Sequence, residues 1–250
     1  TQLQWSDRLR KLTMDATNLH FQYTYNFVVD PTVFSLNAFV SEDLAVNTAR
    51  DILARLEILE GSLGMDLDQE NYTAQQLRFD GTKLVQSTTL FNTSAIRVDY
   101  FRSPLDTVPM VSPHFYVSPV NITISSKANQ TNIDYYPQIL ELNYSYWRIE
   151  KTKFGTYPIV SADIAYTQFE QNYSRYLVFA GEEDDPQVSY VDKKINIVST
   201  REAELGYYNP EKYQQYLQPV WIFKGKATIE TGQQLDFVAY VPAVSAEWIQ

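Results

Sequence analysis

The chain has 250 residues, enough for one large domain or two smaller ones, since a domain averages about 150 residues. A hydrophobic content of 44% excludes a disordered polymer, and the formal net charge of −10 disfavours binding to the phosphate backbone of a nucleic acid. The chain has no cysteine, which excludes disulfides and thiolate chemistry. It has only two histidines, His20 and His114. Little material remains for a catalytic triad or a multi-histidine metal site.

Residues 1–18 are expected to form a helix, because Trp5, Leu9 and Leu12 recur at helical spacing with basic residues between them. The chain begins with threonine and has no methionine start, so we expect a membrane anchor to precede this helix. The basic residues would then lie just outside a membrane, although a solvated amphipathic helix explains the pattern equally well.

Residues 19–118 are expected to form a first module. Aromatic and polar residues alternate from residue 21 to 27, which is typical of a half-buried strand. Apolar residues then recur at helical spacing over residues 41–60, and strands on either side of a turn at residues 79–82 follow. Four prolines between residues 103 and 119 indicate an irregular connection, and this is the best candidate for a boundary between modules.

Residues 119–250 are expected to form a second module with the same order of elements. Ser161 can cap a helix over residues 162–173, and six short strands follow it. A parallel α/β sheet would need a helix between nearly every pair of strands. The sequence therefore predicts an α+β fold of two related modules, each a helix packed on an antiparallel sheet.

No motif for catalysis is visible. The chain has neither a Gly-X-Ser-X-Gly nucleophile motif nor a glycine-rich phosphate loop, and only 8 glycines in all. A pair of catalytic carboxylates among the thirty acidic residues stays open, because their separation in space is not written in the sequence. We expect no enzymatic activity, no cofactor and no bound metal.

Tyrosine crowds the second half of the chain. A set of exposed rings offers a surface for a protein or a glycan, because tyrosine gives a large amphipathic area at low entropic cost. The alternative is that these rings pack the half-buried faces of strands. The candidate surface comprises Tyr135, Tyr136, Tyr207, Tyr208, Tyr213 and Tyr216.

Three C-terminal strings carry a family resemblance: Glu204-Leu-Gly-Tyr-Tyr208, Tyr216-Leu-Gln-Pro-Val-Trp-Ile-Phe-Lys-Gly225 and Phe237-Val-Ala-Tyr-Val-Pro-Ala243. Together they resemble the closing module of the YycH/YycI-type accessory proteins, whose extracytoplasmic domains are similar to PepSY-like folds. The resemblance covers residues 159–249. It implies a single-pass membrane protein whose ectodomain regulates a sensor kinase or another cell-envelope process through protein contacts, with no catalytic residues.

The function that we expect is therefore a non-enzymatic, extracytoplasmic, membrane-anchored domain that binds a protein partner in cell-envelope regulation or signalling. A membrane protein or a sensor kinase is the kind of partner implied, and nucleic acid is not. Two alternatives remain open: an envelope protein that binds or cleaves a glycan through the tyrosine-rich surface, and a structural surface scaffold.

Overall fold

The computed structural model describes residues 1–34, 39, 41–59, 67–125, 139–172, 176–180, 194–210 and 214–245, without the side chains of residues 68, 69 and 180. The described residues are mainly β, with 47% of them in strands and 16% in helices, and they form two sheets and two α-helices. It divides into two compact units, residues 1–102 with 118–148 and residues 103–117 with 149–250.

The α+β expectation is wrong, because the sheets dominate both units. Each unit does contain a helix and antiparallel strands, but the strands are longer than their sequence patterns indicate. Two strands expected at residues 195–200 and 202–208, for example, form the single strand β11 (Ile195–Tyr208), with a bulge between Thr200 and Glu202.

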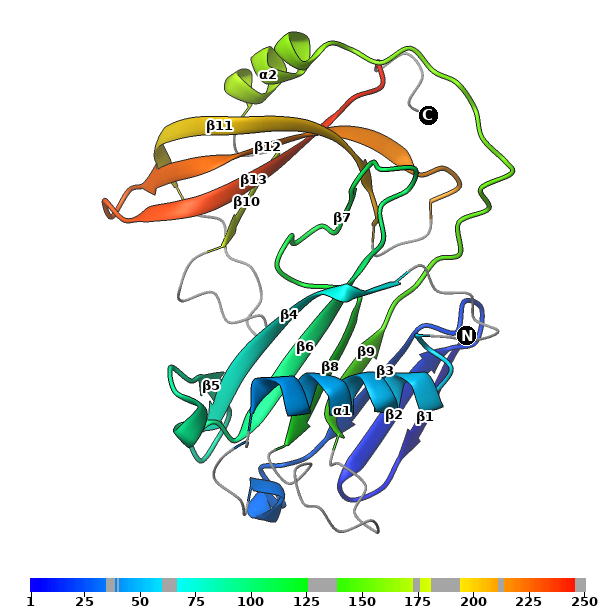
Figure 1. Ribbon diagram of the computed structural model, residues 1–250, viewed down its shortest axis with the longest axis vertical. Helices are drawn as coiled ribbons and strands as arrows, with labels where there is room; N and C mark the ends of the chain where they lie inside the picture. Colours follow the sequence, from blue (N-terminus) through cyan, green and yellow to red (C-terminus); the bar gives the residue numbers. More distant parts are fainter. Residues whose placement is uncertain are drawn as a thin grey trace. The chain divides into compact units, whose positions relative to one another are not determined.

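The first unit contains an eight-stranded antiparallel sheet in the order β1-β2-β3-β9-β8-β6-β4-β5 (Figure 1). Two short 3₁₀ helices, Pro31–Phe34 and Leu90–Asn92, lie in its connections. The strands are β1 (Gln2–Ser6), β2 (Arg10–Asp15), β3 (Phe21–Tyr25), β4 (Leu67–Phe79), β5 (Leu84–Gln86), β6 (Ala95–Arg102), β8 (Val120–Ser125) and β9 (Ile139–Tyr144).

The helix expected over residues 1–18 is also wrong, because this segment forms the hairpin β1–β2. The side chain of Asp7 makes the turn: its Oδ1 accepts hydrogen bonds from the amides of Leu9 (2.8 Å) and Arg10 (2.7 Å). These bonds lower the pKa of the Asp7 carboxyl. Residues on each strand alternate between apolar and polar, and this period of two governs the structure rather than the spacing of Trp5, Leu9 and Leu12.

Helix α1 (Glu42–Arg55) lies against β4, β6 and β8 on one face of this sheet (Figure 1). It begins at Ser41, whose Oγ accepts a hydrogen bond from the amide of Leu44 at 3.1 Å. Its small buried residues, Ala45 and Ala49, let the helix approach the sheet closely. The expected helix at residues 41–60 is thus confirmed over most of its length.

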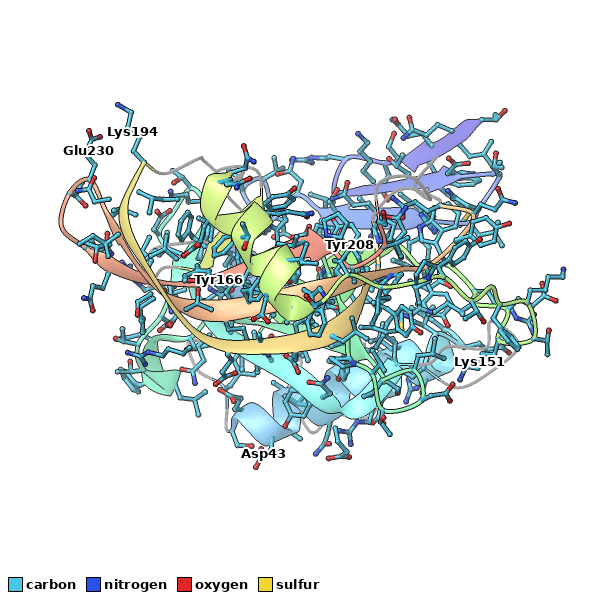
Figure 2. All side chains as sticks on the ribbon, turned by 90° about the horizontal axis from the view of Figure 1, so that it is seen from above. Asp43, Lys151, Tyr166, Lys194, Tyr208 and Glu230 are labelled. Atoms are coloured by element: carbon cyan, nitrogen blue, oxygen red, sulfur yellow. The ribbon has the colours of Figure 1, made fainter. Side chains whose placement is uncertain are left out.

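The second unit contains a five-stranded sheet in the order β10-β13-β12-β11-β7 (Figure 1). Four strands pair antiparallel: β10 (Leu177–Ala180), β11, β12 (Gln218–Ile229) and β13 (Gln234–Pro242). The fifth strand, β7 (Met110–Val111), runs parallel to β11. Lys194 lies just before β11 and Glu230 just after β12. The two form an ion pair, with Nζ and Oε2 3.8 Å apart (Figure 2).

Helix α2 (Ala162–Gln171) covers one face of the smaller sheet. The ring of its fully buried Phe169 stacks on Phe223 and Phe237, with centroids 5.7 and 5.9 Å away. Trp221 is partly buried against the same cluster. Its Nε1 donates a hydrogen bond to the carbonyl of Val160 at 2.9 Å. Phe169, Trp221 and Phe237 therefore share one core.

The units do not follow the expected boundaries at residues 18 and 118. Strands β8 and β9 belong to the first sheet, although the prediction placed them in the second module. The proline-rich segment 103–117 belongs to the second unit because β7 pairs with β11. The chain therefore crosses between units three times instead of once.

Candidate functional site

The pairing of the eight-stranded sheet gives it one apolar and one polar face. Side chains of paired residues lie on the same face, so the register of adjacent strands defines rows that run across the sheet. Two apolar rows are Ala74, Val98, Ile122, Leu142, Tyr23, Leu12, Trp5 and Tyr72, Tyr100, Val120, Tyr144, Phe21, Met14, Leu3. Two polar rows are Gln75, Arg97, Thr123, Glu141, Thr24, Lys11, Ser6 and Thr73, Asp99, Asn121, Asn143, Gln22, Thr13, Gln4.

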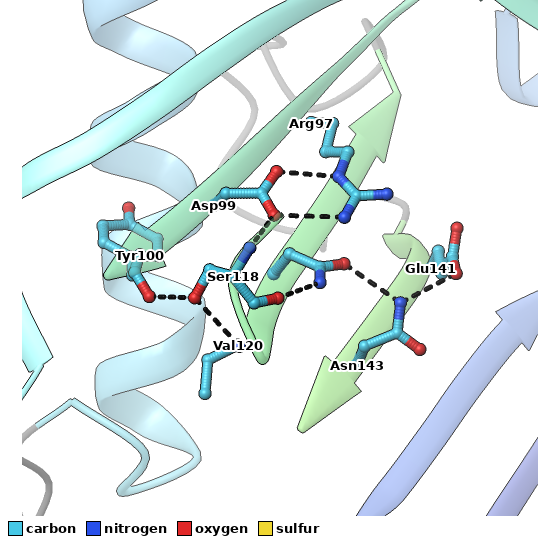
Figure 3. Close-up of polar contacts among 8 residues, drawn as sticks. Arg97, Asp99, Tyr100, Ser118, Val120, Glu141 and Asn143 are labelled. Atoms are coloured by element: carbon cyan, nitrogen blue, oxygen red, sulfur yellow. Dashed lines mark hydrogen bonds and ion pairs between the residues drawn. The ribbon is translucent and has the colours of Figure 1, made fainter. Parts of the chain in front are cut away.

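The centre of the polar face holds a buried hydrogen-bond network (Figure 3). Arg97 binds Asp99 through two parallel hydrogen bonds, Nε to Oδ2 at 2.7 Å and Nη2 to Oδ1 at 3.0 Å, and each residue is only 3% exposed. The Ser118 amide donates to Asp99 Oδ1 at 2.8 Å. Asn143 continues the network, because its Nδ2 donates to Asn121 Oδ1 (3.0 Å) and to a carboxylate oxygen of Glu141 (2.8 Å).

This network stabilises the centre of the sheet, because each of its buried charges has a hydrogen-bond partner. Burial raises the pKa of the Asp99 carboxyl, and the two bonds from Arg97 and the amide of Ser118 oppose that rise. All three partners of Asp99 are donors, so the carboxylate form is the one that the geometry satisfies. The hydroxyls of Thr123 and Ser125 are also buried here, and neither has a hydrogen-bond partner in the described part of the chain.

At one end of the same sheet, away from this network, lies β1, and all five of its residues are exposed. It is the last strand of the sheet, with β2 as its one neighbour among the described residues. Its two apolar side chains end the apolar rows: Leu3 is 39% and Trp5 is 52% exposed. Arg8 and Arg10, both exposed, lie beside them in the turn and at the start of β2. We call β1 together with Arg8 and Arg10 the amino-terminal edge.

The backbone of the amino-terminal edge has unpaired hydrogen-bonding groups. The amide of Ala16 donates to the carbonyl of Thr1 (2.8 Å), and the amide of Asp7 donates to the carbonyl of Arg10 (2.9 Å). Hydrogen-bonded pairs alternate along an antiparallel ladder, so odd-numbered residues of β1 bond to β2. The N–H and C=O groups of the even-numbered residues, Gln2, Gln4 and Ser6, therefore point away from the sheet.

Half of the predicted tyrosine surface falls within the described residues. Tyr135, Tyr136 and Tyr213 lie outside the described residues. Tyr208 of β11, which Figure 2 labels, is half-buried. It packs on Tyr240 with ring centroids 5.7 Å apart. Tyr207 is also half-buried. Tyr216 alone of the described members is exposed, at 58%. Tyr207 and Tyr208 thus follow the alternative in which these rings pack strand faces, whereas Tyr216 stays exposed.

The histidines and acids do not converge on a metal site: among the described residues, no group of three or more His, Asp or Glu side chains could hold an ion. His20 is the residue that comes nearest to a catalytic base. Its Nδ1 lies 3.2 Å from Ser145 Oγ, and its Nε2 lies 2.9 Å from the carbonyl oxygen of Tyr146. Because a carbonyl can only accept, Nε2 carries the proton in the neutral ring and Nδ1 accepts from Ser145.

The surroundings of His20 indicate a structural role. Its ring packs edge-on against Trp147, with centroids 4.2 Å apart, and near Tyr144. Both of its ring nitrogens are used to tie the β2–β3 turn to the end of β9. Within the described ranges no helix is long and apolar enough to cross a membrane.

Comparisons with protein-family models, with curated proteins and with solved structures found no match to the chain. The site is therefore argued from its own residues. Sequence reasoning missed the amino-terminal edge, although the signal was present: Gln2, Leu3, Gln4, Trp5 and Ser6 alternate with a period of two.

Proposed function

We propose that this chain is a non-enzymatic, extracytoplasmic, membrane-anchored domain that works by binding protein at the amino-terminal edge. One observation carries the proposal: β1 combines outward-pointing backbone groups with exposed Leu3 and Trp5. Such an edge recognises an extended strand, because main-chain hydrogen bonds provide affinity and alternate side chains provide specificity. The resemblance to YycH/YycI-type accessory proteins supports a regulatory role in the cell envelope.

The composition supports the non-enzymatic part of the proposal. A chain with no cysteine and two histidines has few groups that can act as nucleophile or base near neutral pH. The Ser–His contact between Ser145 and His20 belongs to the packing around Trp147. We expect a fluorophosphonate probe, which labels activated serines, to react no faster with the chain than with its Ser145→Ala variant. Stoichiometric labelling of Ser145 would contradict this part.

Photo-crosslinking in the source organism tests the binding part. A photoreactive phenylalanine analogue replaces Trp5 in one variant and Ile197, which is 64% exposed on β11 in the other unit, in the matched control. We expect a discrete protein adduct from position 5 and none from position 197. No adduct from position 5, or the same adducts from both positions, would contradict binding at this edge.

Localisation has its own test. Protease added to intact cells should degrade the chain, while a cytosolic marker in the same cells survives. Survival of the chain in intact cells and degradation only after lysis would refute the extracytoplasmic proposal and would leave binding at the edge untouched.

A further inference from the structure

We propose that the strand bound at the amino-terminal edge is β1 of a second copy of this chain, so that two eight-stranded sheets join into one across a two-fold axis at Gln4. This inference rests on the proposed function, because it names the partner that the same edge binds. Three features of β1 carry it: its backbone register, its side-chain pattern and its difference from the other sheet edges.

The backbone register allows a closed pairing. In an antiparallel pair of identical strands, residues whose numbers sum to a constant face each other. A sum of eight is the register that pairs all five residues of β1, and it sets Gln4 opposite Gln4 and Gln2 opposite Ser6. These even-numbered residues are the ones with outward N–H and C=O groups. Three facing pairs would each exchange two hydrogen bonds.

The side chains of β1 complement one another in this register. On the apolar face, Leu3 of each copy lies opposite Trp5 of the other, and such pairs stabilise a sheet. On the polar face, the amide side chains of Gln4 face each other. No charged residue lies within β1, so no like charges oppose across the new pair. The apolar rows, which now end exposed at Leu3 and Trp5, would continue into the second copy.

Charges on β2 follow the same symmetry. Lys11 pairs with Ser6, and Asp15 pairs with Gln2. Because Ser6 would face the second copy's Gln2, Lys11 of one copy would lie in the same row of side chains as Asp15 of the other. The separation is three strand spacings, about 14 Å, where the attraction is weak but has the favourable sign. Locally, residues 1–29 contain three basic and two acidic side chains, so this end does not share the repulsion of a chain with net charge −10.

β1 differs from the other sheet edges. Proteins protect edge strands from pairing by making them very short or by placing charges or proline on them. The strands that end the described sheets elsewhere are short: β5 has 3 residues, β7 has 2 and β10 has 4. The longer strands beside them, β4 and β11, extend past β5 and β7, and these stretches carry charged residues: Glu70 on β4, and Arg201, Glu202 and Glu204 on β11. β1 has 5 residues with neither charge nor proline. A two-fold pairing uses up both unprotected edges, so it stops at two copies rather than growing into a fibre.

The absence of cysteine makes a direct test simple. In a Gln4→Cys variant, the two introduced thiols would face each other with Cα atoms about 5.5 Å apart, within the range that a disulfide spans. We expect mild oxidation to convert this variant into a covalent dimer. Gln2→Cys is the matched control: two copies of residue 2 would be about 14 Å apart, so it stays monomeric alone. A mixture of Gln2→Cys and Ser6→Cys chains cross-links.

Sedimentation of the full chain without oxidation provides the second test. Over about 1 to 500 µM, which brackets the affinities of small interfaces, we expect a monomer–dimer equilibrium. Gln4→Pro removes an outward N–H that the monomer does not use, so it should keep the thermal melting of the chain and weaken dimerisation at least about tenfold. Gln4→Val, which keeps the N–H, should dimerise like the wild type.

The outcomes separate the two proposals. Monomeric sedimentation at every concentration, or equal cross-linking of Gln4→Cys and Gln2→Cys, overturns the second-copy inference. If position 5 then photo-crosslinks to a different polypeptide, binding at the edge survives with another partner. If position 5 gives no adduct, both proposals fail.

Discussion

Removing one member of the Arg97–Asp99 pair should destabilise the first unit far more than removing both. Both side chains are only 4% exposed and share two hydrogen bonds, so Arg97→Met takes the guanidinium away from the buried Asp99 carboxylate, and Asp99→Asn removes a buried negative charge from beside the Arg97 guanidinium. We expect Arg97→Met and Asp99→Asn each to lower the free energy of unfolding by about 3 to 5 kcal/mol. The double variant, which buries no charge and keeps an acceptor for the Ser118 amide, should lose no more than about 2 kcal/mol.

The loss in Arg97→Met should also depend on pH. Without the guanidinium, burial raises the pKa of Asp99 further above its ordinary value. A raised carboxyl pKa in the folded state means that the folded chain holds its proton longer than the unfolded chain, so stability is lost as pH rises from about 4. Arg97→Met should therefore be less impaired at pH 4 than at pH 8, and the double variant should lack this extra loss.

Native-state hydrogen exchange on peptides from β6 and β8 is the appropriate assay, because the chain has two units and a single unfolding transition cannot be assumed. Loss in the double variant equal to the sum of the single losses would refute the coupling. Losses under about 1 kcal/mol in both single variants would refute the burial argument itself.

Three further predictions use other buried groups. Thr123→Val should raise the free energy of unfolding by about 1 kcal/mol, measured by native-state hydrogen exchange in β8, because it removes a buried hydroxyl without a described partner; a loss would show that the hydroxyl is satisfied. Burial raises the pKa of Tyr25 and of Tyr100 to about 12. The contribution of these two rings to the free energy of unfolding is therefore fully present below pH 10 and is lost as pH rises toward 12. Thermal melts across this range should show the fall, and Tyr100→Phe should reduce it. Phe169→Ala should lower the free energy of unfolding by about 3 to 5 kcal/mol, measured by native-state hydrogen exchange in β12 and β13, because the ring is fully buried. Ile164→Ala, on the exposed side of the same helix, is the control, and equal losses would contradict the packing.

Elements with local signals could be predicted from the sequence. Ser41 and Ser161 mark the starts of both helices, because each side chain accepts a hydrogen bond from an amide in the first turn. Asp80 and Gly81 mark the β4–β5 turn: Asp80 Oδ1 accepts from the amides of Thr82 and Lys83, and Gly81 has a positive φ of 103°. Signals of this kind act within a few residues.

Features that depend on distant partners could not be predicted. The period of two in β6 and β8 indicates one apolar and one polar face, and a polar face is normally exposed to solvent. Arg97, Asp99 and Asn121 are nevertheless buried, because long-range pairing places their partners beside them. The boundary between units was missed for the same reason, since β8 joins a sheet formed mostly by residues that precede the proline-rich segment.

The amino-terminal edge was missed for a different reason. The basic residues of its turn suggested a helix near a membrane. The spacing of Trp5, Leu9 and Leu12 fits a helix, but three residues are too few to distinguish a helix from a coincidence. Asp7 decides between the two structures, because its carboxylate caps the turn that lets β1 and β2 pair. With this hairpin formed, Trp5 belongs to a strand edge.

Hydrogen exchange at the backbone amide of Gln4, followed by nuclear magnetic resonance at two chain concentrations, tests the dimer most directly. In a single chain this amide points away from the sheet and has no acceptor among the described residues, so it should exchange at the rate of an unstructured peptide. We expect its exchange to slow as concentration rises, while that of Leu3, already bonded within the sheet, stays constant. Equally fast exchange of Gln4 at both concentrations would contradict strand pairing at this edge.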